Sequence, residues 1–318
     1  MDAKITRRVV LGTVITALAA GPFIMRSLHR KKHLPDIGRA KMKRQWDALL
    51  QEVTPDVKPM GSQQPVLCQL MPEVGEFPYT ILYPVYNDLS EWPQETPDLF
   101  HCRSGQFSTK MIGGETVLTG KDTESVVVSP KGSQPFPLET WIMAMRNNIF
   151  VPMEFADDRL SELDWNRDSD QFSQLMSLYA GLASDAPGRA LTVGDTWTVG
   201  GLLGGEFVGS VTRHYMGKFA INGRPVFQVN TKQDVGFADL MALAEDTLPR
   251  VKNKSLRDKI NNEMEPMRKM QGRIIAENTS YFDVDTGVLI FRKFEKSIFQ
   301  SDRLSPVSLE RSFTVVKV

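Results

Sequence analysis

The sequence has few of the residues that carry enzyme chemistry. Its 318 residues include two cysteines and four histidines, and the two cysteines, Cys68 and Cys102, lack the close spacing of a structural zinc site. It also lacks the Gly-x-Ser-x-Gly elbow of serine hydrolases and the His-Glu-x-x-His sequence of zinc proteases. We therefore expect a protein that is not an enzyme, and the sequence indicates no catalytic residue.

Two segments are similar to functional motifs, and neither meets all the requirements of its motif. His101 and Cys102 are neighbours on an expected strand, so their side chains point to opposite faces and cannot form a thiol-base pair. Gly114–Lys121 is similar to a phosphate-binding loop, but it is one residue too long. It is also followed by Asp122, where a serine or threonine would hold magnesium. We expect a hairpin turn there instead.

A 17-residue stretch without charge, residues 9–25, follows the arginine pair Arg7-Arg8. Thr6, the two arginines and the apolar residues after them resemble a twin-arginine export signal of bacteria, and Ala17-Leu18-Ala19 supplies a small-x-small cleavage pattern. The resemblance implies recognition by an export machinery. The body of the protein would then lie in the periplasm or at the outer face of the inner membrane.

The alternative for residues 1–25 is an uncleaved anchor. Seventeen helical residues reach about 25 Å, at the short end of what a hydrocarbon core of about 30 Å requires. Residues 26–44 then carry eight lysines and arginines and a single aspartate. Because basic segments beside a membrane span tend to stay in the cytoplasm, such an anchor would leave the body inside the cell.

The sequence of residues 26–60 predicts a basic arm followed by an amphipathic helix. The helix is predicted over Ala40–Val53, where Met42, Trp46 and Leu49 fall on one face. Near an anionic membrane each basic residue of the arm contributes about 1 kcal/mol. The residues available for such a contact are Arg26, Arg30, Lys31 and Lys32. Equally, the arm could fold back onto residues 45–318, which carry 36 acidic and 27 basic residues. This acidic excess argues against nucleic acid as a partner.

The rest of the chain is divided into two β-rich parts. Residues 61–190 contain strand patterns and one helix at 170–183, and residues 191–318 form an antiparallel sheet with a helical insertion at 237–270. Asn222-Gly223 is a strong hairpin signal in the second part. The predicted fold class is α+β: a large antiparallel meander, open or curved into a half-barrel, with a few packed helices.

Short motifs in the second part are similar to a family of exported bacterial proteins of unknown function. They are Val193–Trp197, Asn222-Gly223-Arg224, and Tyr281-Phe282-Asp283 with Gly287. This resemblance implies no catalytic residue. In architecture alone, a meander crossed by a helix looks like the half-barrel carriers of lipid and lipoprotein in the periplasm, which implies an apolar ligand.

One segment suggests a metal. Oxygen-bearing side chains at every second position are typical of the first half of a calcium loop. The candidate ligands are Asp164, Asn166, Asp168 and Asp170. However, Ser169 stands where the loop needs glycine and Leu175 where it needs the closing glutamate. The alternative is that Asp168–Asp170 cap the helix that follows. We expect no cofactor other than this calcium.

The two cysteines, Cys68 and Cys102, would form a disulfide in an oxidising compartment or remain as two buried free thiols. The sequence as a whole predicts a non-enzymatic envelope protein that binds an apolar ligand or another envelope component. Two alternatives remain. One is a structural or interaction protein tethered to the membrane by its basic arm, and the other is a hydrolase that uses carboxylates within Glu154–Asp170.

Overall fold

A computed structural model gives the structure of most of the chain beyond the N-terminal segment. It describes residues 36–61, 65–71, 74–85, 97–138, 140–146, 149–152, 182, 186–199, 210–236, 272–301 and 304–309, and the single residues 238, 242, 245, 254, 258 and 261. These residues form antiparallel strands and one continuous helix, α2 (Asp36–Val53). The described part is therefore mainly β.

The seven-stranded sheet contains most of the C-terminal half. Its strands are β1 (Val57–Pro59), β11 (Ser210–Ile221), β12 (Arg224–Gly236), β13 (Gly272–Asp283), β14 (Leu289–Ser301) and β15 (Leu304–Leu309) in spatial order, with β10 (Thr196–Val199) also paired to β11. Asn222 and Gly223 have φ angles of 52° and 82°. Ile221 pairs with Arg224, which confirms the predicted two-residue hairpin turn.

The six-stranded sheet is built from the N-terminal half. Its strands are β3 (Val74–Val85), β4 (Leu99–Ile112), β5 (Glu115–Ser129), β7 (Thr140–Arg146) and β8 (Ile149–Pro152), and β6 (Gly132–Pro135) pairs with β5. Gly113 and Gly114, at φ 59° and 83°, form a two-residue hairpin turn between β4 and β5, so the segment that is similar to a phosphate-binding loop begins in this turn and continues as strand β5. Two short strands, β2 (Val66–Cys68) and β9 (Arg189–Leu191), pair separately.

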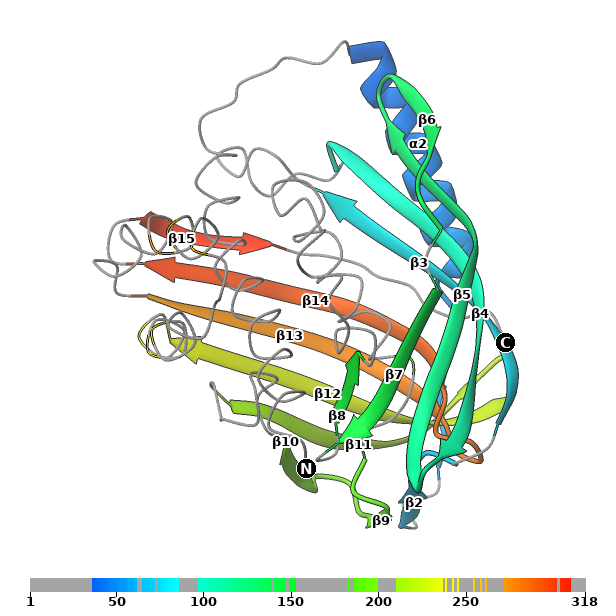
Figure 1. Ribbon diagram of the computed structural model, residues 1–318. Coiled ribbons are helices and arrows are strands. Elements are labelled where there is room, and N and C mark those ends of the chain that lie inside the picture. The colour runs from blue at the N-terminus through cyan, green and yellow to red at the C-terminus, as the bar shows by residue number, and fades with distance from the viewer. Residues whose placement is uncertain are drawn as a thin grey trace.

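Side chains from both sheets meet in one apolar core. Tyr79, Phe107 and Trp141 of the six-stranded sheet join Phe227 and Phe282 of the seven-stranded sheet. The other buried members are Val66, Cys68, Ile81, Leu118, Met143, Leu182, Leu191, Tyr215, Val229, Val288 and Leu289. We call the face of each sheet that carries these side chains its inner face. Figure 1 shows both sheets curved and standing side by side, as in a half-barrel.

Helix α2 covers the other face of the six-stranded sheet. Met42 and Trp46 are buried against Leu82, Phe100 and Val128, and the Trp46 and Phe100 ring centroids are 5.1 Å apart. The predicted helical face at 40–53 is therefore confirmed. The helix starts four residues earlier than predicted, at Asp36. Since this helix uses its apolar residues on its own sheet, that surface is not available to a membrane.

The prediction of an α+β fold with a few helices needs correction, because α2 is the one continuous helix of the described residues. Most of the predicted helix at 170–183 lies outside them, although Leu182 is buried and its carbonyl accepts a hydrogen bond from the Leu289 amide at 2.9 Å. In the predicted insertion at 237–270, the six described residues are helical and exposed. No described helix combines the length and the apolar character needed to span a bilayer.

Of the two alternatives for the cysteines, the structure shows the free thiols and not the disulfide. Cys68 belongs to the shared core, whereas Cys102 packs beside α2 on the opposite face of the six-stranded sheet. The sheet itself therefore separates them. Burial raises the pKa of Cys68 to about 12. Burial, followed by the charges of Glu124 and Glu52, also raises the pKa of Cys102.

Candidate ligand-binding site

The inner face of the six-stranded sheet changes from apolar to polar along β4. Phe107 belongs to the shared core, and two alternating positions further along the same face the buried side chain is Arg103, followed by His101. The side chain of Arg103 is 1% exposed. A fully buried arginine is uncommon in proteins unless it is paired, so its partners decide what this face can do.

Arg103 is paired with one carboxylate on the neighbouring strand. Its Nη1 donates to Asp122 Oδ2 at 2.5 Å, and the Asp122 side chain is fully buried. The other carboxylate oxygen, Oδ1, accepts a hydrogen bond from the Tyr79 hydroxyl at 2.6 Å. Trp141 Nε1 in turn donates to the Tyr79 hydroxyl oxygen at 3.3 Å. Four strands therefore contribute to one buried polar network.

A β-bulge places Asp122 in this network. The pairing of β4 with β5 shifts between Ser104 and Gly105, so that Gly105 pairs with Asp122 rather than with Thr123. An unbroken alternation would have turned Thr123 inward, because residues of one face recur every second position. With the bulge, Thr123 is exposed and Asp122 is buried on the inner face. The acidic partner of Arg103 thus depends on one extra residue in β5.

One edge of the Arg103 guanidinium has no partner among the described residues. Among the residues that the structure describes, no acceptor lies within hydrogen-bonding distance of Nε or Nη2. The hydroxyl of Ser125, which is 4% exposed and directly opposite Arg103 in the strand pairing, is also without a partner. Nε and Nη2 point to the same side of the planar group, which is the side that can bind two oxygen atoms together.

Two further rings lie near the Arg103 guanidinium. Phe136 lies over the face of the guanidinium, with its centroid 5.1 Å from Cζ. His101 meets the same phenyl ring edge-on at a centroid distance of 5.2 Å. Burial first, and the charge of Arg103 second, lower the pKa of His101 to about 4. His101 is therefore neutral near pH 7 and adds no charge to the site.

The inner face of the seven-stranded sheet carries polar groups beyond the core as well. Arg213 donates from Nη1 to Thr231 Oγ1 at 2.9 Å, and Arg292 donates from Nε to Ser280 Oγ at 2.8 Å. Thr231 is two positions from the core residue Val229, and Ser280 pairs with Val229, so all four side chains share that inner face. Both sheets therefore pass from apolar to arginine-bearing surface.

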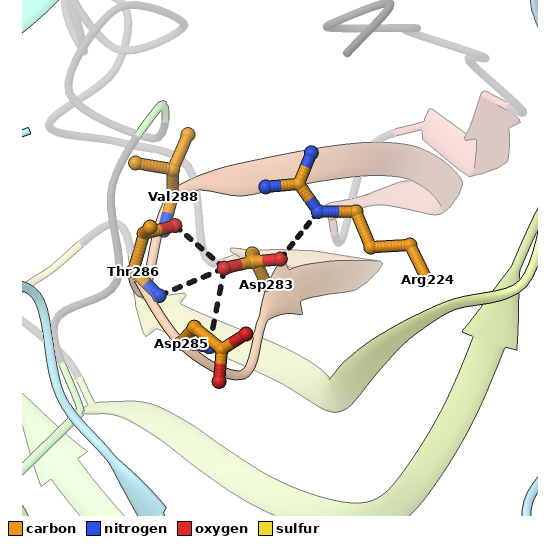
Figure 2. Close-up of polar contacts among 5 residues, drawn as sticks. All are labelled: Arg224, Asp283, Asp285, Thr286 and Val288. Carbon is orange, nitrogen blue, oxygen red and sulfur yellow. Dashed lines mark hydrogen bonds and ion pairs between the residues drawn. The ribbon is translucent and has the colours of Figure 1, made fainter. Parts of the chain in front are cut away.

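A second buried carboxylate belongs to the turn after β13 and serves the fold. Asp283 Oδ1 accepts hydrogen bonds from the amides of Asp285 and Thr286 at 3.1 and 2.8 Å, and from the Thr286 hydroxyl at 2.8 Å (Figure 2). Oδ2 accepts from Arg224 Nε at 2.5 Å. Burial acts to raise the pKa of Asp283, but the bonds from Thr286 and Arg224 outweigh it and hold the pKa below its ordinary value.

This turn brings together motifs that the sequence analysis singled out. Arg224 follows the Asn222-Gly223 turn, and Asp283 ends the Tyr281-Phe282-Asp283 segment. Gly287 has a φ angle of 70°, and a Cβ atom there would overlap the backbone of Gln69. These positions are explained by the packing of the hairpin, since the side-chain hydrogen bonds of Asp283 come from Arg224 and from the turn itself, and Gly287 makes room for Gln69.

Several predicted functional residues lie outside the described part of the chain. They are the signal arginines Arg7 and Arg8, the arm residues Arg26, Arg30, Lys31 and Lys32, the calcium candidates Asp164, Asn166, Asp168 and Asp170, and the carboxylates of 154–170. Within the described residues no group of three histidine, cysteine or acidic side chains is arranged to hold a metal.

The sequence analysis missed the network of Tyr79, Arg103, Asp122 and Ser125. A signal was present in the alternation of β4, which places Arg103 on the same face as Phe107. A basic residue in an inward-facing position indicates a buried partner. The identity of that partner could not be read in the same way, because the bulge in β5 interrupts the alternation there.

Comparisons with known proteins leave the family open. No protein-family model matches the sequence, and a search of curated proteins found no match. Among solved structures, the chain matches the crystal structure of LprF from Mycobacterium bovis with 11% sequence identity and a TM-score of 0.21, over 76% of this chain and 84% of that chain. At this TM-score the match supports no inference about function.

Proposed function

We propose that the protein is a non-enzymatic binding protein of the bacterial envelope that holds an apolar ligand against the inner faces of its two sheets. The observation that carries the proposal is the partnerless edge of Arg103 beside the shared apolar core. Nearly all buried polar groups in folded proteins have a hydrogen-bond partner, and an exception calls for an explanation. A bound molecule that completes these contacts is such an explanation.

The surroundings of Arg103 fit an apolar ligand better than a polar one. Along the inner face, Arg103 is followed by the Tyr79 ring lying over Gly105 and then by Phe107 and Trp141. These rings are only 1–2% exposed, so a ligand group that reaches Arg103 from this side meets an apolar lining. Binding sites for small molecules commonly combine such a lining with a few well-placed polar groups.

The envelope location rests on the predicted export signal at Arg7-Arg8. An envelope location in turn supports an apolar ligand, because the periplasm contains lipids and lipid precursors in transit between membranes. A periplasmic reporter fused after residue 60 should be active if the signal functions. Replacing Arg7-Arg8 by two lysines should retain the protein in the cytoplasm, since the twin-arginine receptor reads the pair itself.

Native mass spectrometry tests the binding function directly. Protein isolated from its own envelope should carry a non-covalent adduct that disappears after extraction with organic solvent. The extracted protein should then bind an apolar fluorescent probe saturably, and the extracted lipid should displace that probe. Absence of any adduct together with absence of saturable probe binding would refute the proposed function.

The alternative of a membrane tether has less support. Of its two elements, the amphipathic helix α2 packs its apolar residues Met42 and Trp46 against the protein's own sheet. The tether would then depend on the basic arm alone, through Arg26, Arg30, Lys31 and Lys32. Sedimentation with anionic liposomes tests it, because binding by the arm must weaken with added salt and with replacement of these four residues by glutamine.

A further inference from the structure

We infer that the bound ligand has a carboxylate head, and that this head is held by the Nε and Nη2 groups of Arg103 together with the hydroxyl of Ser125. The inference rests on the proposed function, because the apolar part of the ligand would occupy the inner face described above. It adds the chemical class of the ligand: a long-chain fatty acid or another acyl chain that ends in a carboxylate.

The first argument is geometric. Asp122 uses only Nη1 of Arg103, so the Nε/Nη2 edge is left whole. A carboxylate matches this edge with two parallel hydrogen bonds, since its two oxygens have the spacing of the two donors. Ser125 lies opposite Arg103 on the neighbouring strand and points to the same face, where its hydroxyl can donate to one of these oxygens.

The second argument is burial. Arg103 and Ser125 are 1% and 4% exposed, so bulk water cannot satisfy their free donors. Leaving a buried charged donor without a partner is unfavourable, and a ligand acceptor at this edge relieves that cost. Three unsatisfied polar atoms on two paired residues therefore favour one ligand group that contacts all of them.

The third argument concerns shape and charge. Phe136 covers one face of the guanidinium and leaves its Nε/Nη2 edge uncovered, and a flat carboxylate can approach that edge in the plane of the group. Asp122 already balances the charge of Arg103, and the Tyr79 hydroxyl bond disperses part of the Asp122 charge. A single additional negative charge is therefore easier to accommodate than the two charges of a phosphate monoester.

The experiment compares ligands that share an acyl chain but differ in the head group. Full-length delipidated protein is titrated with palmitate, with methyl palmitate and with phosphatidylglycerol, and binding is followed by calorimetry or by the fluorescence of Trp141 and the other tryptophans. Palmitate should bind at least about tenfold more tightly than its ester, because the ester lacks the charge that strengthens the bonds to Arg103.

Two variants locate the head group. Ser125→Ala should weaken palmitate binding severalfold and leave the ester unaffected, while the unliganded protein keeps its stability because a partnerless hydroxyl is removed. Arg103→Lys keeps a cation for Asp122 but lacks the two-donor edge, so it should abolish the preference for the acid. Ser104→Ala is the matched control, since Ser104 lies on the opposite face of β4, where it bonds Thr80.

The outcomes separate the two proposals. Equal binding of acid and ester in the wild type, unchanged in Ser125→Ala, would overturn the carboxylate inference and leave the binding function in place. Binding of phosphatidylglycerol in preference to palmitate, lost in Ser125→Ala, would replace the carboxylate by a phosphodiester. Failure of all three ligands and of the apolar probe would refute the binding function itself. If Arg103→Lys does not fold, Ser125→Ala still decides the question.

Discussion

The Tyr79 side chain lies directly over Gly105, where the absence of a Cβ atom lets its hydroxyl reach Asp122. A Cβ atom at position 105 would stand 2.5 Å from Tyr79 Cζ and would overlap the hydroxyl oxygen. Gly120 makes the same kind of room for the Trp141 ring. The polar network on the inner face therefore depends on two glycines in neighbouring strands, for reasons of space rather than of backbone conformation.

Gly105→Ala should therefore destabilise the protein by about 1–3 kcal/mol, the usual range for overpacking in a filled core. The added methyl group must push Tyr79 away from Asp122 or move the backbone of β4. Urea unfolding followed by tryptophan fluorescence measures the change. Gly75→Ala is the control, because nothing lies within 4 Å of a Cβ atom there. If Gly105→Ala loses no more unfolding free energy than Gly75→Ala does, then the Tyr79 ring does not crowd position 105 as the structure indicates.

The buried pair of Arg103 and Asp122 should behave as a unit. Asp122→Leu leaves an uncompensated buried cation and should cost about 3–5 kcal/mol of unfolding free energy, as should Arg103→Met. The double variant removes both charges and should be more stable than either single variant. A double-mutant cycle by urea unfolding gives the coupling energy. If the loss of unfolding free energy in the double variant equals the sum of the losses in the two single variants, the two residues are not energetically coupled.

Local sequence patterns were sufficient to predict those structural features that depend only on residues close together in the chain. The Asn222-Gly223 turn, the helical face at Met42 and Trp46, and the opposite directions of His101 and Cys102 all follow from spacing along the chain. These features are set by backbone preference and by periods of two or 3.6 residues. They could therefore be predicted without knowledge of the tertiary structure.

The candidate site depends on contacts that no local pattern contains. Tyr79 and Asp122 are 43 positions apart, and Trp141 is 62 positions from Tyr79. Their meeting requires the pairing of β3, β4, β5 and β7 and the bulge that turns Asp122 inward. The choice between a disulfide and two free thiols was left open for the same reason, since only the tertiary structure shows that Cys68 and Cys102 lie on different sides of a sheet.

His101 should make the stability of the protein depend on pH between about 6.5 and 4. Its pKa is lowered to about 4, by burial first and by Arg103 second, whereas the unfolded chain has a histidine pKa near 6.5. Over this interval the unfolded state binds more protons than the folded state, so stability decreases as the pH falls. At 1.36 kcal/mol per pKa unit, the loss approaches about 3 kcal/mol.

Replacing His101 by asparagine should remove this part of the pH dependence. Urea unfolding at pH 7, 6, 5 and 4 would show a shallower decline of stability in His101→Asn than in the wild type. The comparison concerns slopes, so a constant loss from the altered packing against Phe136 does not affect it. Parallel curves for the two proteins would mean that His101 titrates normally in the folded state.

Asp283 should also make the stability of the protein depend on pH, but in a lower pH range than His101 does. Because its folded pKa lies below the ordinary value for aspartate, its contribution is fully present above about pH 4 and is lost as the pH falls through the folded pKa. Asp283→Asn should therefore destabilise the protein at pH 7, by about 2–3 kcal/mol for the weakened bonds to Arg224 and Thr286.

The difference between wild type and Asp283→Asn should then narrow as the pH is lowered from 4 toward 2, since the wild-type carboxylate becomes protonated and loses the same bonds. Asp285→Asn is the matched control two residues away, where the side chain is exposed and only the backbone amide contacts Asp283. It should change stability little at any pH. A gap between wild type and Asp283→Asn that stays constant down to pH 2 would show that the hairpin does not depend on the charge of Asp283.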